Sequence, residues 1–121
     1  MKRILVVDDE QQILRLLTGF LSSRGYDVFT ASDGVEALSK VRTVHPDAVL
    51  LDIIMPGMGG IEVLKEIKAI DPETVVLMIT GVIDEQVNEL ARQAGADGYI
   101  LKPFNFDDLD TALREKLNRA P

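Results

Sequence analysis

The sequence of 121 residues predicts an α/β fold, in which helices cover both faces of a central parallel sheet. Short apolar runs alternate along the chain with longer stretches whose apolar residues recur three and four positions apart. The short runs are typical of parallel strands buried on both faces, and the longer stretches are typical of amphipathic helices. Regular alternation of the two favours a single three-layer domain.

Four of the five expected strands are rich in valine, isoleucine and leucine; they lie at residues 4–7, 48–51, 75–79 and 99–101. The remaining strand, residues 26–31, is more polar, which indicates an edge strand. Five strands with a polar second strand favour the flavodoxin-like, doubly wound order 2-1-3-4-5 over a small Rossmann-like sheet. The connections are expected to be right-handed crossovers.

Each of the five helices is expected from one apolar stripe. The stripes are Ile13, Leu14, Leu17, Phe20 and Leu21; Val35, Leu38 and Val41; Ile61, Leu64 and Ile67; Val87, Leu90, Ala91 and Ala94; and Leu109, Ala112, Leu113 and Leu117. Gly25 and Gly95 are expected to end the first and fourth helices, as glycines often do. Gly57, Gly59 and Gly60 are interpreted as a flexible turn after the third strand.

Composition excludes several classes of function. Twenty acidic residues against 13 Lys and Arg give a net charge of −7, which repels nucleic-acid phosphates, so we expect no direct nucleic-acid binding. The absence of cysteine excludes disulfide scaffolds, cysteine-ligated zinc and thiol catalysis. The first apolar run is too short for a signal peptide or membrane span, so we expect a cytoplasmic protein without a membrane partner.

Polar residues follow four of the expected strands. Asp8 and Asp9 follow the first, Asp52 the third, Thr80 the fourth and Lys102 the fifth. Ligands of open α/β sheets bind beyond the carboxyl ends of the strands, at the point where strand order switches. In the order 2-1-3-4-5, the first and third strands are neighbours, so the three aspartates are expected to lie together there.

Three clustered carboxylates repel one another unless a cation binds between them. Oxygen ligands of this kind suit Mg²⁺. A carboxylate beside Mg²⁺ can attack a phosphoryl group and form an acyl phosphate. Lys102 and Thr80 would then meet the phosphoryl oxygens, one as a charge and one as a hydrogen-bond donor.

Each position taken alone also has a structural interpretation. The acidic residues 8–10 could cap the first helix, Asp52 could lie in a surface turn, and Thr80 and Lys102 could be an ordinary strand end and loop lysine. The joint occurrence of these residues at one edge of the sheet favours a site. His45, the single histidine, is interpreted as a surface loop residue.

Four ordered segments carry a family resemblance: Ile-Leu-Val-Val-Asp-Asp-Glu (4–10), Leu-Leu-Asp-Ile-Ile-Met-Pro-Gly-Met (50–58), Ile-Thr-Gly (79–81) and Gly-Ala-Asp-Gly-Tyr-Ile-Leu-Lys-Pro-Phe (95–104). Through them the chain resembles the receiver domain of two-component response regulators over essentially its whole length. The resemblance implies a single receiver domain over residues 1–121, with no effector domain in this chain.

The resemblance implies that Asp52 accepts a phosphoryl group from a sensor histidine kinase or a phosphotransfer protein. It also implies that Asp8, Asp9, Asp52 and the backbone carbonyl of Ile54 hold Mg²⁺. The chain would then be a signalling switch that catalyses only its own phosphorylation and slow dephosphorylation. Slow loss is expected because Ile54 and Val82, two positions after Asp52 and Thr80, cannot hydrogen-bond an attacking water.

The resemblance further implies how the switch works. Thr80 would move to bond the acyl phosphate, Lys102 would pair with it, and Tyr99 would be the switch aromatic. The Lys102–Pro103 bond would be cis. The output would be a downstream effector protein or domain, with a possible dimer through the fourth helix, fifth strand and fifth helix. Gly59 stands where the family often has an aspartate, a departure expected to affect only a helix cap.

Two other classes share parts of this pattern. A phosphatase of the haloacid-dehalogenase type also uses an aspartyl phosphate, but it needs a second aspartate two positions after the nucleophile, where this chain has Ile54. A flavin- or nucleotide-binding module would need a phosphate-cradling loop after the first strand, where the acidic residues 8–10 stand instead.

Overall fold

The computed structural model describes residues 1–54, 57–81 and 84–118. Strands and helices alternate through these residues in the order β1 (Arg3–Val7), α1 (Gln11–Ser23), β2 (Asp27–Ala31), α2 (Gly34–Val44), β3 (Ala48–Asp52), α3 (Gly60–Ile70), β4 (Val75–Thr80), α4 (Glu85–Gln93), β5 (Gly98–Leu101) and α5 (Phe106–Leu117). The alternation predicted from the apolar runs is therefore confirmed.

The strands form one parallel sheet in the order β2-β1-β3-β4-β5, which confirms the flavodoxin-like arrangement. The polar strand β2 lies at one edge of the sheet, as its composition predicts. The register places Asp52 beside Ile79 and Thr80 beside Leu101. The ends of β3, β4 and β5 therefore lie side by side.

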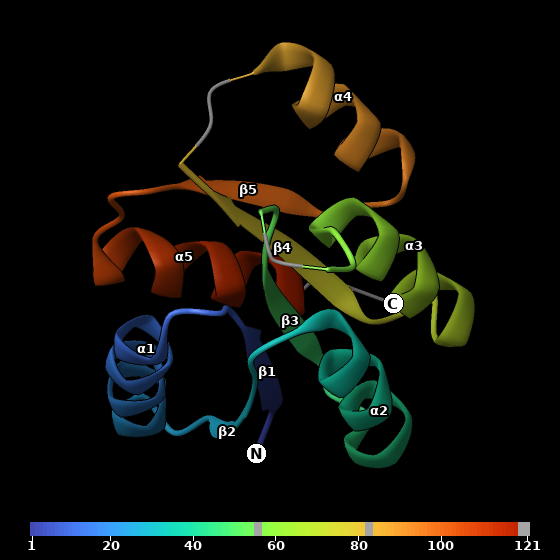
Figure 1. The fold of residues 1–121 in the computed structure, drawn as a ribbon. Coiled ribbons are helices and arrows are strands. Elements are labelled where there is room, and N and C mark those ends of the chain that lie inside the picture. The colour runs from blue at the N-terminus through green and yellow to red at the C-terminus, as the bar shows by residue number, and fades with distance from the viewer. Residues whose placement is uncertain (55–56, 82–83, 119–121) are drawn as a thin grey trace.

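Two layers of helices cover the sheet (Figure 1). Helices α1 and α5 pack on one face, where Ile4 and Val6 of β1 join their apolar residues in one core. Helices α2, α3 and α4 pack on the other face, with Leu5 and Val7. Alternate residues of β1 thus enter opposite cores, as strand geometry requires, and the inner strands are buried on both faces.

Two of the sequence predictions about burial are wrong. Strand β5 was expected to be buried on both faces, but it lies at the sheet edge, and both Tyr99 and Leu101 are exposed. In α2, Val35 is exposed because the buried face of that helix runs through Ala37, Leu38 and Val41.

Helix α4 buries less of its predicted apolar stripe than expected, although Val87 and Ala94 are partly buried against the core. Ala91 is the buried residue of this helix, whereas Leu90 of the same predicted stripe is exposed. None of the helices described is long and apolar enough to cross a membrane.

The glycines mark the ends of helices. Gly25 and Gly95 follow α1 and α4 with φ values of +89° and +106°, so both predicted helix ends are confirmed. The interpretation of the glycines after β3 as one flexible turn is wrong. Gly57 has a φ of +76°, but Gly59 is the N-cap of α3 and Gly60 is its first residue.

Candidate functional site

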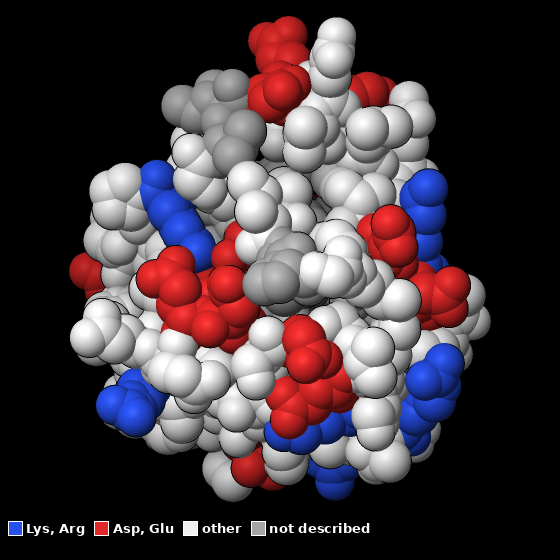
Figure 2. Space-filling view, in the orientation of Figure 1, with Lys and Arg blue, Asp and Glu red and all other residues white. Residues whose placement is uncertain are grey.

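Three aspartates meet at the carboxyl ends of the neighbouring strands β1 and β3. Carboxylate oxygens of Asp8, Asp9 and Asp52 all lie within 4.8 Å of one another. Asp8 is 2% and Asp52 7% exposed, whereas Asp9 is open to solvent. Figure 2 shows acidic side chains gathered beside a basic one, in the area where Figure 1 places the ends of these strands. The cluster predicted from strand order is present.

The carboxylate of Asp52 is held at both of its oxygens. The backbone N–H of Ile54 donates a hydrogen bond to Oδ1 at 3.1 Å, and Nζ of Lys102 lies 3.2 Å from Oδ2. The same Nζ lies 3.1 Å from Oδ2 of Asp8. Lys102 therefore bridges the two buried aspartates, although it comes from the far side of β4.

Burial and charge shift the pKa values of these groups. Burial raises the pKa of the Asp52 carboxyl, and the neighbouring charge of Asp8 raises it further, against the opposing effects of the Ile54 N–H and Lys102. Burial lowers the pKa of Lys102, but its hydrogen bonds and ion pairs with Asp8 and Asp52 outweigh that effect and raise it overall. The lysine is thus held in its charged form, whereas ionisation of Asp52 is disfavoured.

The donor set fits a hard divalent cation. One lysine charge faces three carboxylates, so the cluster keeps an excess of negative charge. Carboxylate oxygens close together at the end of a sheet are ligands that suit Mg²⁺, and Mg²⁺ usually keeps several waters. The backbone carbonyl of Ile54, two positions after Asp52, is the further ligand that the family resemblance implies.

Thr80 and Lys102 lie on adjacent strand ends beside this cluster. Thr80 is the last residue of β4 and is buried, and its carbonyl accepts a hydrogen bond of 2.7 Å from the Lys102 N–H. The peptide bond between Lys102 and Pro103 is cis, which confirms what the resemblance implied. The backbone of Lys102 is thus hydrogen-bonded to β4, and its side chain reaches the aspartates.

The structure does not support the alternative in which the acidic residues only cap a helix or lie in a surface turn. The N-cap of α1 is Glu10, whose side chain makes no capping hydrogen bond; instead, Oδ1 of Asp8 accepts the Glu10 N–H at 2.9 Å. Asp52 ends a buried strand rather than lying in a surface turn. His45 is the C-cap of α2, at the opposite end of that helix from the carboxyl edge of the sheet.

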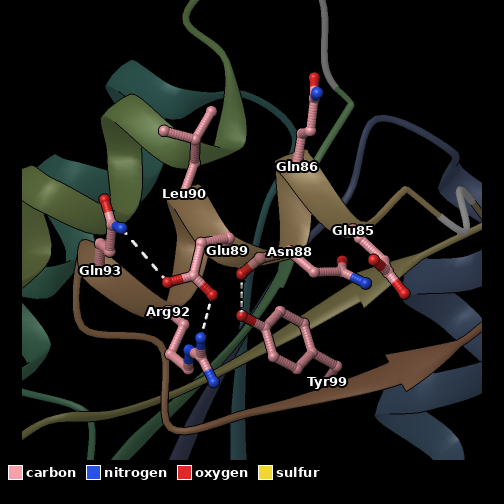
Figure 3. A pocket seen from close by; sticks show the side chains of 8 residues that line it. All are labelled: Glu85, Gln86, Asn88, Glu89, Leu90, Arg92, Gln93 and Tyr99. Atoms are coloured by element: carbon pink, nitrogen blue, oxygen red, sulfur yellow. Dashed lines mark hydrogen bonds and ion pairs between the residues drawn. The ribbon is translucent and has the colours of Figure 1, made fainter.

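Tyr99 lies in a pocket of about 750 Å³ between α4 and β5 (Figure 3). Its hydroxyl donates a hydrogen bond to the backbone carbonyl of Asn88. Burial raises the pKa of the Tyr99 phenol. The other lining residues come from α4: Glu85, Gln86, Asn88, Glu89, Leu90, Arg92 and Gln93. Tyr99 thus faces α4 across this pocket and is joined to the helix by its hydroxyl.

Sequence reasoning missed a second lysine–aspartate pair. Lys68 of α3 lies 2.8 Å from Oδ2 of Asp97, which precedes β5. Asp97 lies in the quoted segment 95–104, but nothing in the sequence indicates Lys68 as its partner.

Two residues, Ile54 and Val82, are expected to make dephosphorylation slow. Ile54 is 63% exposed and lies beside Asp52. Val82, and residues 55–56 of the quoted family segment, lie outside the described residues.

Comparison with known proteins agrees with this geometry. A sequence model of the response regulator receiver domain matches residues 4–114. The alkaline phosphatase synthesis transcriptional regulatory protein PhoP of Bacillus subtilis is 42% identical over 98% of this chain and 50% of its own length. The DNA-binding response regulator MtrA of Mycobacterium tuberculosis is 41% identical over 98% of this chain and 51% of its own. This chain therefore spans about half the length of these relatives.

Solved structures show the same fold. A CheY-like receiver domain protein from Methanospirillum hungatei superimposes with a TM-score of 0.95 at 36% identity, covering 98% of this chain and 94% of that one. A receiver domain protein from Clostridium thermocellum gives a TM-score of 0.93, also at 36% identity, over 98% and 96% of the two chains. These matches favour neither the phosphatase nor the flavin-binding alternative. With its five-stranded parallel sheet and aspartate cluster, the chain belongs to the response regulator receiver domain family of two-component systems.

Proposed function

We propose that this chain is a phosphorylation switch in which Asp52 accepts a phosphoryl group from a phosphohistidine of a sensor kinase or a phosphotransfer protein. The observation that carries the proposal is the placement of the Asp52 carboxylate. It is buried, held at one oxygen by the Ile54 N–H and at the other by Lys102, beside two further aspartates.

In the transfer, one carboxylate oxygen of Asp52 attacks the phosphorus atom. The phosphorus–nitrogen bond of the donor breaks, its electron pair returns to the imidazole, and an acyl phosphate forms. Asp8, Asp9, Asp52 and the Ile54 carbonyl would hold Mg²⁺, and the positive charge they hold there would offset the charge on the phosphoryl oxygens. Lys102 already lies at hydrogen-bond distance from Asp52, so its ammonium pairs with the same oxygens.

The signal leaves through Thr80 and Tyr99. Thr80, buried at the end of β4, bonds the acyl phosphate, and Tyr99 then gives up its place against α4. A helix with little buried surface responds readily to such a change, and α4 is of this kind. The surface of α4, β5 and α5 is therefore proposed to contact the effector or a second copy of the chain.

The partners follow from the family and the charge. A sensor histidine kinase or phosphotransfer protein supplies the phosphoryl group in the cytoplasm, and a downstream effector protein or domain receives the signal. The relatives PhoP and MtrA are named as transcriptional or DNA-binding regulators and are about twice as long as this chain. The net charge of −7 supports a role in which this chain does not itself contact DNA.

The test is transfer from acetyl phosphate in the presence of Mg²⁺, followed by intact-mass spectrometry. The wild-type chain should gain one phosphoryl group and Asp52→Asn none, because an amide cannot form the acyl phosphate. Asp47→Asn is the matched control, since Asp47 pairs with the backbone N–H of Arg3 far from the cluster. Equal labelling of Asp52→Asn and wild type would refute the proposal.

A further inference from the structure

Gly60, the first residue of α3, lies against the backbone that carries the candidate phosphoacceptor. A Cβ atom at this position would lie 2.4 Å from the Asp52 carbonyl oxygen and 2.7 Å from Cα of Ile53. Real Cβ atoms do not approach other atoms closer than about 3.0 Å. Both contacted atoms belong to the main chain, so neither can rotate aside as a side chain would. Residue 60 must lack a side chain for the end of β3 to keep its place.

The neighbouring glycines do not share this constraint. Gly59 is the N-cap of α3, and a Cβ there would meet nothing within 4 Å. Gly34 is also close-packed, but the nearest atom to its Cβ would be the side-chain Cγ2 of Val63. Gly60 is therefore set apart by a close approach to backbone atoms of the site, and not by a need for a left-handed conformation.

The backbone of Ile53, the residue next to Asp52, is fixed by hydrogen bonds at both its N–H and its carbonyl. The N–H of Gly60 donates to the Ile53 carbonyl at 2.9 Å, and the N–H of Ile53 donates to the Ile79 carbonyl at 3.2 Å. The following N–H, that of Ile54, donates to Oδ1 of Asp52. A shift at Ile53 is therefore passed to the hydrogen bond that orients the Asp52 carboxylate.

We propose that Gly60 is a positioning residue for phosphoryl acceptance by Asp52. By letting α3 begin in contact with the end of β3, it fixes the N–H of Ile54 against the Asp52 carboxylate. This inference rests on the proposed function of Asp52. It adds that a residue with no chemistry of its own sets the geometry of the reacting group.

The test compares Gly60→Ala with Gly59→Ala. Mg²⁺ affinity is measured by NMR titration and the initial phosphorylation rate with acetyl phosphate, at a temperature where both variants are folded. Gly60→Ala should lose about 10- to 100-fold in both quantities, the usual cost of displacing groups that support a metal ligand or a reacting atom. Gly59→Ala should stay within about twofold of wild type, since its Cβ meets nothing.

A third measurement, hydrogen exchange, distinguishes a change in the position of the Ile54 N–H from a general loss of stability, and it does not depend on phosphorylation. Hydrogen exchange of the Ile54 amide should speed up in Gly60→Ala and not in Gly59→Ala. It should also stay unchanged in Asp97→Asn, a control expected to lose stability because it breaks the Lys68–Asp97 ion pair, which lies where the strands begin. If the wild type is not phosphorylated but this difference is found, the proposed function fails, and what remains for Gly60 is the placement of the Ile54 N–H against Asp52, without a role in phosphoryl acceptance. If the wild type is labelled and Gly60→Ala matches it in affinity, rate and exchange, the positioning role is overturned.

A second variant covers the case in which Gly60→Ala does not fold. Semisynthesis can replace Gly60 by glycolic acid, which removes the N–H donor to the Ile53 carbonyl and adds no side chain. Loss of Mg²⁺ affinity and faster exchange at Ile54 are again expected, with a smaller amplitude than for Gly60→Ala. Wild-type values for this ester variant would overturn the proposal.

Discussion

Two lysine–aspartate clusters lie at opposite ends of the strands of the same sheet and differ in charge balance. At the amino edge, where the strands begin, Lys68 pairs with Asp97 at 2.8 Å. At the carboxyl edge, where the strands end, Lys102 pairs with Asp8 and Asp52 at 3.1 and 3.2 Å. The two lysine side chains are similarly exposed, at 18% and 22%. Burial and distance alone do not distinguish the two clusters.

The amino-edge pair is neutral as a unit and tied into the backbone. Nζ of Lys68 also donates to the Thr74 carbonyl at 2.6 Å, and Oδ2 of Asp97 also accepts the Val76 N–H at 2.8 Å. These bonds join α3, the start of β4 and the chain entering β5. The pair therefore supports the fold.

The carboxyl-edge cluster sets one lysine against three carboxylates. Part of its charge is left for a ligand to balance, and ionisation of Asp52 costs free energy of folding because burial raises its pKa. Charge balance, more than burial, therefore separates the ion pair that holds the fold from the cluster proposed to bind a cation and a phosphoryl group. Five predictions test that distinction.

The largest difference is expected when each lysine loses its charge. Lys102→Met should lower the phosphorylation rate by about 100-fold, since a charge beside the transferred group is worth about that much. Lys68→Met should leave the rate within about twofold once the protein is folded. Rates from acetyl phosphate, measured well below the unfolding temperature, check this. Equal losses in the two variants would remove the distinction between the clusters.

Stability should respond with opposite signs at the two edges. Asp97→Asn should lower the free energy of unfolding by about 2 kcal/mol, because it leaves the Lys68 charge without its carboxylate; the pair is partly exposed, so this lies below the cost for a fully buried pair. Asp52→Asn should instead raise it by about 1 kcal/mol in EDTA, because it removes a charge that burial and the neighbouring Asp8 disfavour. Urea unfolding measures both changes.

The gain in Asp52→Asn should also depend on pH. The folded-state pKa of Asp52 is raised, so the folded chain binds the proton more tightly than the unfolded chain, and stability falls as pH rises through the range between the two values. The gain should therefore be present at about pH 7 and absent below the ordinary aspartate pKa of about 3.9. A gain that persists there would assign it to packing rather than to charge.

Mg²⁺ should stabilise the carboxyl edge and leave the other edge unchanged. A ligand at ten times its dissociation constant adds about 1.4 kcal/mol to the free energy of unfolding. Wild type and Asp97→Asn should both gain this increment, and Asp9→Asn should gain much less at the same concentration. Thermal unfolding with and without Mg²⁺ measures it. A full increment in Asp9→Asn would exclude Asp9 as a ligand.

Much of the site could be predicted from the sequence because strand ends fix it. Parallel order places residues that follow neighbouring strands at one edge, so Asp8, Asp52 and Lys102 could be brought together without coordinates. The exposure of β5 was missed even though the predicted strand order places this strand at an edge of the sheet. Its apolar run resembles those of β1 and β3 and predicts burial on both faces, whereas the edge position leaves Tyr99 and Leu101 exposed.

Two further features depend on packing that periodicity does not encode. Lys68 has the pattern of an exposed helical lysine, and its partner Asp97 lies 29 residues away in a loop. Gly60 was interpreted as part of a flexible turn because adjacent glycines indicate conformational freedom. The structure instead requires Gly60 for space, which depends on how closely α3 approaches β3.

The smallest effect is expected at an exposed side chain beside the carboxyl-edge cluster. Ile54 lies two positions after Asp52, is largely exposed and cannot hydrogen-bond a water that attacks the acyl phosphate. Ile54→Asn supplies a carboxamide that can orient such a water, so the phosphoryl group should be lost about three- to tenfold faster, a change of up to about 1.4 kcal/mol in the barrier. Val35→Asn, the same kind of change at an exposed position on α2, should leave the half-life unchanged. Phosphoryl loss after donor removal measures both. If the two variants match wild type, apolar shielding at Ile54 does not limit hydrolysis, and the charge of the cluster alone governs the lifetime.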